Sequence, residues 1–215
     1  MTVADLLTKL GGVPAERVRL EPLPGTATEE DLLAIQRREK RNCELIDGVL
    51  VEKTVGLPEA VLAGWMVTLL YRFLGHSDLG ILAGASGPFR LMPGLIRMPT
   101  ISFISWDQLP KRRIPTKPIV NFPPDLAVEI LIAGNTKAEM ERKLREYFLA
   151  GTRLVWLVNP RKRTVRVYTA SDQSRLLKED QSLDGGEVLP GLRLALGEIF
   201  AKLGRRPARR KRNER

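Results

Sequence analysis

The spacing of apolar residues along the chain predicts four helices, in the ranges 28–40, 58–75, 136–150 and 196–203. The first follows a segment, 28–31, that resembles a capping box. The second opens at Pro58 and carries a wide apolar face that we expect to be core. The third is capped by Asn135 or Thr136 and is stopped by Gly151.

Short β-prone runs between turn residues predict the strands. Asp47-Gly48 separates 43–46 from 49–51, and this dipeptide favours a hairpin because glycine accepts the positive φ of a type I′ turn. The run 126–132 is apolar except for Glu129, which is typical of a central strand buried on both faces. The remaining expected strands are 81–85, 89–92 and 95–104, which we interpret as a meander, and 154–158 and 164–169.

The order strand, helix, strand between 125 and 158 predicts a βαβ unit, whose two strands should be parallel. We therefore expect an α/β fold of the α+β kind, with helices flanking a mixed sheet. The expected domain covers 28–203, after an N-terminal extension at 1–27. A basic tail at 204–215 holds too little apolar surface to join a core, so we expect it to be disordered.

Composition narrows the functional classes. The single cysteine excludes an intrachain disulfide framework and a four-thiolate zinc site. The single histidine, His76, would have to be the base of any Ser-His-Asp or Cys-His catalyst. The longest nearly unbroken apolar run, 60–71, has 12 residues and is short of the roughly 18 that suggest a membrane span. With no signal-peptide core in 1–10, we expect a cytoplasmic protein and no membrane partner.

Positive charge gathers in three places along a chain whose formal net charge is +10. The segment 202–215 alone holds eight basic residues and one acid, and either attracts phosphates or only aids solubility. Two smaller clusters lie in turns between apolar segments. Their residues, Lys111, Arg112 and Arg113, and Arg161, Lys162 and Arg163, are the candidate nucleic-acid contacts.

Glu129 is the most informative single residue, because an unpaired carboxylate inside an apolar strand is costly to bury. It should meet a cation, a hydrogen-bonding network or a metal. Lys143 lies on the helix that packs back on the sheet and can reach toward Glu129. The plainer alternatives are a structural ion pair at Glu129 and a solvated lysine at 143.

Several spaced blocks of the sequence resemble the Uma family of restriction endonucleases, which belongs to the PD-(D/E)XK nuclease superfamily. The blocks are Glu44-Leu45-Ile46-Asp47-Gly48, Arg97-Met98-Pro99-Thr100, and the segments 124–131, 143–151, 155–160, 165–168 and 188–192. The resemblance covers about 28–200 and is specific because the blocks occur in order. It implies a restriction-endonuclease-like core flanked by helices, and hydrolysis of DNA phosphodiester bonds with Mg²⁺ or Mn²⁺.

The resemblance also implies roles for single residues. Glu129 and Glu44 match the acidic metal ligands, and Lys143 matches the lysine that assists the attacking water. The remaining metal-binding aspartate of the family is replaced by Thr100, a neutral and weak ligand. We therefore expect an endonuclease with impaired activity. Because nucleases of this superfamily often dimerise, the resemblance further implies a homodimer.

Two alternatives stay open from the sequence. One is a catalytically inactive protein of the nuclease fold that binds nucleic acid through its basic clusters and tail. The other is a scaffold module without a nucleic-acid role, in which the tail only aids solubility. Metal-dependent cleavage separates the first interpretation from both alternatives, and salt-sensitive binding separates the alternatives from each other.

Overall fold

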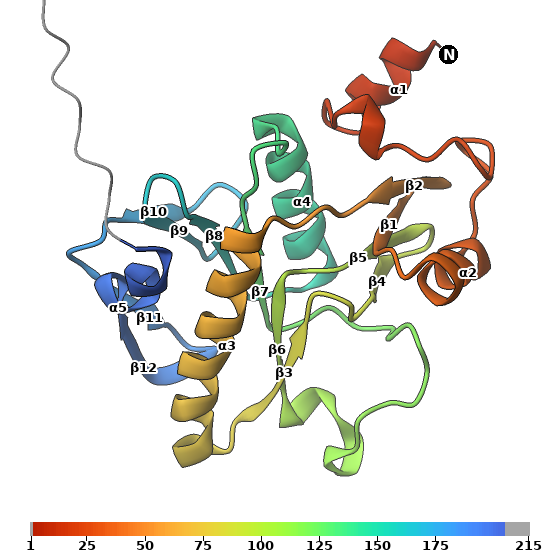
Figure 1. The fold of residues 1–215 in the computed structure, drawn as a ribbon. Helices are drawn as coiled ribbons and strands as arrows, with labels where there is room; N and C mark the ends of the chain where they lie inside the picture. Colours follow the sequence, from red (N-terminus) through yellow and green to blue (C-terminus); the bar gives the residue numbers. More distant parts are fainter. Residues whose placement is uncertain (1, 205–215) are drawn as a thin grey trace, which may run out of the picture.

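A computed structural model describes residues 2–204 and gives them five α-helices and twelve β-strands (Figure 1). The helices are α1 (Val3–Lys9), α2 (Glu29–Glu39), α3 (Leu57–Ser77), α4 (Lys137–Ala150) and α5 (Leu196–Phe200). The strands are β1 (Cys43–Ile46), β2 (Val49–Glu52), β3 (Gly80–Gly84), β4 (Phe89–Met92), β5 (Leu95–Arg97), β6 (Ile101–Ser105), β7 (Leu126–Ile130), β8 (Leu154–Asn159), β9 (Thr164–Tyr168), β10 (Ser174–Leu177), β11 (Ser182–Gly185) and β12 (Leu189–Ala195). The predicted fold class, helices around mixed sheets, is confirmed.

The larger sheet has six strands in the order β10-β9-β8-β7-β6-β3. β7 and β8 are parallel and α4 connects them, so the predicted βαβ unit is confirmed. Thr136 caps α4 by accepting a hydrogen bond from the Glu139 N–H, and Gly151 ends the helix with a φ of 104°. This unit fixes the helix that carries Lys143 against the strand that carries Glu129.

Side chains of β7 alternate between two faces of the sheet. Leu126 and Val128 join the apolar core under α3, which crosses in front of the sheet in Figure 1. Ala127 instead packs in the cluster that contains Leu144 of α4. Because side chains two apart on a strand share a face, Glu129 lies on the side of α4.

Among the described residues, α3 is the one helix long and apolar enough to cross a membrane, by length and composition alone. Its most apolar window has a mean hydropathy of 1.3. Five apolar side chains of this helix are nevertheless buried in the protein: Leu62, Met66, Leu69, Leu70 and Leu74. These side chains pack one face of the helix into the apolar core, and 28% of the most apolar window is buried.

A second sheet has four strands in the order β2-β1-β5-β4. Its β1–β2 hairpin turns at Asp47 and Gly48, whose φ values of 50° and 74° agree with the predicted type I′ turn. Gly48 is also required by space, because a Cβ atom there would lie 2.5 Å from the carbonyl oxygen of Gly25. The hairpin therefore holds β1 in a fixed register beside β5.

The predicted meander is wrong, because the run 95–104 forms two strands rather than one. β5 belongs to the four-stranded sheet and β6 to the six-stranded sheet. Pro99 provides the physical reason, since it has no N–H to donate to a ladder and restricts the preceding Met98. The break leaves Thr100 immediately before β6, between the two sheets.

Residues 2–27, the expected extension, pack against the domain. Buried beside α4 are Leu6, Leu10 and Val13. Gly11 approaches α4 so closely that a Cβ atom there would lie 2.8 Å from the Cα atom of Glu139. Of the expected basic tail, 204–215, residues 205–215 lie outside the described residues.

Candidate functional site

The four-stranded sheet places Glu44 beside Arg97. Leu45 of β1 pairs with Ile96 of β5, so the preceding residue of β1 lies opposite Arg97. Arg97 Nη1 donates to Glu44 Oε2 at 2.7 Å, and its Nε and Nη2 donate to Glu146 Oε2 of α4. The side chains of Glu44 and Arg97 are each 1% exposed, so this ion pair is shielded from water.

The six-stranded sheet places Thr100 opposite Glu129. Ile101 of β6 pairs with Val128 of β7, and the Thr100 N–H donates to the Val128 carbonyl oxygen at 2.9 Å. Thr100 Oγ1 in turn accepts a hydrogen bond from the Ile130 N–H at 3.3 Å. The hydroxyl therefore lies within the site, at the position where the resemblance implies an aspartate.

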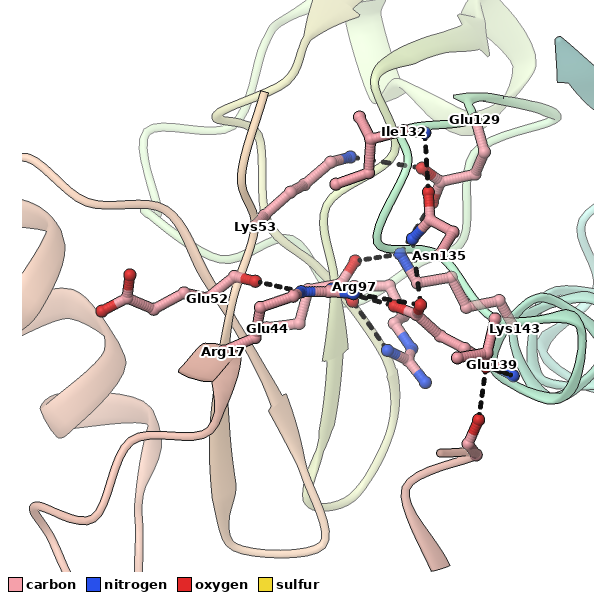
Figure 2. A network of polar contacts seen from close by, with 12 residues as sticks. Arg17, Glu44, Glu52, Lys53, Arg97, Glu129, Ile132, Asn135, Glu139 and Lys143 are labelled. Atoms are coloured by element: carbon pink, nitrogen blue, oxygen red, sulfur yellow. Dashed lines mark hydrogen bonds and ion pairs between the residues drawn. The ribbon is translucent and has the colours of Figure 1, made fainter. Parts of the chain in front are cut away.

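Helix α4 contributes Lys143 and Tyr147, which are one turn apart. Lys143 Nζ donates to Glu44 Oε1 at 2.9 Å and to Glu129 Oε1 at 3.2 Å. The Tyr147 hydroxyl donates to the same Glu129 oxygen at 2.7 Å. The structure thus brings Glu44, Glu129 and Lys143 together from β1, β7 and α4 (Figure 2).

A second lysine, Lys53, enters the site and is absent from the set predicted from the sequence. It follows β2, and its Nζ lies 3.3 Å from Glu129 Oε2 and 3.4 Å from Thr100 Oγ1. It also donates to the Met98 carbonyl oxygen. Figure 2 shows its side chain pointing toward Glu129. With a side chain only 10% exposed, Lys53 is part of the buried network.

Two residues of the site, Lys53 and Arg97, were missed, and the sequence contains a signal for Arg97 alone; Lys53 reaches the site through the pairing of the hairpin. Glu44 pairs with Val51 in the β1–β2 hairpin, and Lys53, two positions further, lies on the same face. Arg97 stands among apolar residues, which is the same anomaly that identifies Glu129. Strand register, which fixes both contacts, is the information that the sequence alone does not supply.

Every carboxylate oxygen of Glu44 and Glu129 accepts a hydrogen bond from the protein itself. The donors to Glu44 are Lys143, Arg97 and the Met98 N–H, and the donors to Glu129 are Lys143, Tyr147 and Lys53. Three of these donors are cations. Buried carboxylates are costly unless they are paired and hydrogen-bonded, so this arrangement satisfies both groups internally.

The neighbouring lysine and arginine side chains also shift the pKa values of the two buried glutamates. Burial alone would raise the pKa of Glu129, but the ammonium groups of Lys143 and Lys53 outweigh it and hold the pKa below its ordinary value. Burial is likewise outweighed at Glu44, where Lys143 and Arg97 lower the pKa. Burial lowers the pKa of Lys53, whereas the two carboxylates overcome burial and raise that of Lys143. Both carboxyl groups are therefore ionised at neutral pH.

The residues of this site do not fit a divalent metal ion as they stand. Within residues 2–204, no group of three or more His, Cys, Asp or Glu side chains is arranged to hold a metal. Mg²⁺ requires oxygen ligands at roughly 2.0–2.1 Å, and the carboxylate oxygens of Glu44 and Glu129 already accept protein hydrogen bonds. Thr100 adds a neutral hydroxyl. The expected Mg²⁺ or Mn²⁺ would therefore have to compete with Lys143, Lys53 and Arg97 for these carboxylates.

The site adjoins a groove. A cavity of about 20 Å³, room for a single water molecule, is lined by Lys53, Thr100, Glu129 and Lys143 among others. An adjoining groove has a volume of about 630 Å³. Four residues border both spaces: Arg17, Thr54, Glu59 and Ile132. A substrate in the groove would therefore lie next to the buried network.

The two expected basic clusters lie at opposite ends of the strands. Arg161, Lys162 and Arg163 follow β8, which is parallel to β7, and so lie at the end where Glu129 is located. Arg161 lines the groove, and Arg163 pairs with Glu179 at 2.6 Å. The other cluster is Lys111, Arg112 and Arg113, which follows the antiparallel β6 and lies at the other end. Only the first cluster adjoins the site.

Comparisons with known proteins identify the family and the fold. A family model described as "Putative restriction endonuclease" matches residues 29–197. The crystal structure of a putative nuclease belonging to DUF820, from Anabaena variabilis, is similar with a TM-score of 0.67 and 18% sequence identity. That similarity covers 76% of this chain and 92% of the other, and at this identity it shows the fold alone. No curated protein matches.

The restriction-endonuclease-like fold expected from the resemblance is thereby confirmed. The family match extends over well more than half of the chain and includes the segments that carry Glu44, Lys53, Thr100, Glu129 and Lys143. The chain belongs to the Uma2 family of putative restriction endonucleases.

Proposed function

We propose that this protein binds DNA with a restriction-endonuclease fold and that its metal-dependent hydrolysis of phosphodiester bonds is impaired. The family supports a nuclease-type function in general. The observation that supports impairment is that the two acidic residues are paired with cations of the protein and that the third acidic position is neutral. Glu44 and Glu129 are paired with protein cations, and Thr100 stands at the remaining acidic position.

The chemistry of this class explains why that state matters. Divalent-metal hydrolysis depends on a metal-bound water with a lowered pKa and on stabilisation of charge at the phosphate. The chain retains Glu129 and Glu44 as the expected ligands and Lys143 as the expected electrostatic partner of the water. Its acids are engaged in internal ion pairs, so we propose that cleavage is slow or lost.

Binding to DNA is supported by the position of one basic cluster. Arg161 lines the groove beside the site, and Lys162 and Arg163 adjoin it in sequence. Contacts of this kind are made to phosphates and depend on counterion release. We therefore propose that the groove side of the protein faces the nucleic-acid backbone.

Cleavage is tested by incubating the full chain with supercoiled plasmid and short duplexes, with Mg²⁺ or Mn²⁺ and with a chelator. We expect strand breakage with metal to be slow, or no greater than with chelator. Rapid linearisation that requires metal and is abolished by Glu129→Gln would overturn the proposed impairment.

Binding is tested by fluorescence anisotropy on the same duplexes over a range of salt concentrations. We expect affinity to fall steeply with salt and to fall further in Arg161→Glu. The matched control is Lys111→Glu, in the cluster at the other end of the strands, which should bind as the unchanged protein does. Absence of binding to duplex DNA and duplex RNA would instead favour the scaffold alternative, and preference for RNA would correct the substrate.

The cellular setting and assembly are further parts of this proposal. A nucleic-acid partner and a single buried thiol, Cys43, support a cytoplasmic location.

A homodimer follows from the family resemblance and would allow both strands of a duplex to be engaged. Light scattering coupled to size exclusion measures the mass in solution, and a monomer at micromolar concentration would contradict the dimer.

A further inference from the structure

Lys53 lies where three oxygen atoms from separate segments converge. These are the Met98 carbonyl oxygen, Thr100 Oγ1 at 3.4 Å and Glu129 Oε2 at 3.3 Å. An ammonium group has three N–H donors and no acceptor, so three acceptors satisfy it completely. The side chain is 10% exposed, which makes this a buried cation in a cage of oxygens.

The three oxygens around Lys53 are of the types that bind a metal cation, but the set has one carboxylate fewer than such a site would have with an acid at position 100. A backbone carbonyl, a hydroxyl and a carboxylate are all hard oxygen ligands of the kind that bind Mg²⁺. A carboxylate in place of Thr100 would give the cage two acids, on β7 and just before β6. With threonine the cage holds a single negative charge, which one ammonium group neutralises.

We propose that the ammonium group of Lys53 occupies the cation position of this site, so that the chain carries its own positive charge there and excludes a divalent ion. Thr100, in place of the aspartate that the resemblance implies, and Lys53 then belong together: the first removes a negative charge from the site, and the second supplies the positive charge that a metal would have supplied. This inference deepens the proposed function, because it names what replaces the metal in the impaired site.

Two features separate this arrangement from an ordinary ion pair. Lys143 already bonds Glu129 Oε1 and is shared with Glu44, so Glu129 has a cation without Lys53. Lys53 therefore adds a second positive charge to one carboxylate, at the oxygen on the side of Thr100. A divalent ion entering the cage would have to displace that charge.

The test is a calorimetric titration of Mn²⁺ into four folded proteins: the unchanged chain, Thr100→Asp, Lys53→Met, and the double variant. Methionine is one atom shorter than lysine; it keeps most of the apolar stem and removes the charge. We expect no measurable binding to the unchanged chain or to Lys53→Met. Thr100→Asp should bind weakly, because the new carboxylate pairs with Lys53, and the double variant should bind at least tenfold more tightly than Thr100→Asp.

The matched control is Lys137→Met, which removes a lysine with a side chain that is 91% exposed on the same α4 helix as Lys143. Combined with Thr100→Asp, it should leave Mn²⁺ binding as in Thr100→Asp alone. Equal binding by Thr100→Asp and the Lys53→Met double variant would overturn the inference. So would a folded double variant that binds no Mn²⁺.

A second experiment needs no metal and measures whether a small organic cation can replace the ammonium group of Lys53. Lys53→Ala removes the ammonium group and most of its stem, and leaves room among the three oxygens. Propylammonium should raise the melting temperature of this variant by several degrees more than that of the unchanged chain, and propanol should not. Equal shifts with the two additives, or equal shifts in the two proteins, would contradict a specific cation position.

The two proposals fail in different ways. Metal-dependent cleavage by the unchanged chain would end the proposed impairment. Tight Mn²⁺ binding by Thr100→Asp alone would end the role of Lys53 and leave the impairment of the unchanged chain intact.

Discussion

Replacing Lys143 by methionine should destabilise the protein strongly, because this one ammonium group serves two buried carboxylates. Its Nζ lies 2.9 Å from Glu44 Oε1 and 3.2 Å from Glu129 Oε1. The exposed fractions of the three side chains are 3%, 1% and 5%. Methionine fills most of the same volume, so the change acts mainly on charge rather than on packing.

The magnitude follows from the geometry. At an effective dielectric constant of 20, two unit charges about 3 Å apart attract by roughly 5 kcal/mol, and the loss of hydration offsets much of this. Removing one partner of a buried ion pair costs about 3–5 kcal/mol. Each carboxylate keeps another cation, Arg97 for Glu44 and Lys53 for Glu129, so we expect a loss of about 3 kcal/mol.

Urea unfolding monitored by tryptophan fluorescence measures this free energy of unfolding. In a chain of this length a loss of about 3 kcal/mol lowers the melting temperature by roughly 6–12 °C. The matched control, Lys137→Met on the exposed face of α4, should change the free energy of unfolding by less than about 0.5 kcal/mol.

A loss below about 1 kcal/mol for Lys143→Met would refute the view that the two carboxylates depend on this cation. The double variant with Glu129→Gln provides a second check, because it removes one of the stranded charges. It should be more stable than Lys143→Met alone. A double variant that is less stable would show that packing, rather than charge, accounts for the effect.

Three further predictions concern acid, a thiol and a turn. The pKa values of Glu44 and Glu129 in the folded protein are held below 4.5, so the unfolded chain binds more protons in acid than the folded chain does. The contribution of these two carboxylates to the free energy of unfolding is complete above about pH 5 and is lost as the pH falls through the lowered pKa values. The free energy of unfolding should therefore fall as the pH is lowered from about 5 to about 2, and a flat profile would contradict the ion pairs. Burial raises the pKa of the Cys43 thiol to about 11, so at pH 8 a thiol reagent should label it only after unfolding; rapid labelling of native protein would argue against this burial. Gly48→Ala should cost at least about 2 kcal/mol in thermal unfolding because its φ is positive and Gly25 leaves no room, and an unchanged melting temperature would argue against this turn geometry.

The part of the site that lies within one supersecondary unit could be predicted from the sequence. Glu129 is recognisable as a charge in a buried strand, and the order strand, helix, strand places the next helix against it. Helical periodicity then identifies Lys143 and Tyr147 as neighbours on one face. These inferences need only local periodicity and the handedness of a βαβ unit.

The part that depends on contacts between the two sheets could not be predicted in the same way. Lys53 and Arg97 reach the site because β2, β1 and β5 are held in one register beside β6 and β7. Nothing local to Lys53 distinguishes it from a solvated lysine at the end of a strand. Pro99 was the available sign that the run 95–104 divides, and its missing N–H is the physical reason that the chain passes from one sheet to the other.

The groove beside the network has a wall made by the beginning of the chain. Pro14, Glu16 and Arg17 line it, and Arg17 is anchored to Glu139 of α4 by two hydrogen bonds of 2.8 and 3.0 Å. These positions precede residue 29, where the family match begins. Proteins that share the matched core but differ ahead of it will therefore present entrances of different shape and charge, even where every buried acid and lysine is the same.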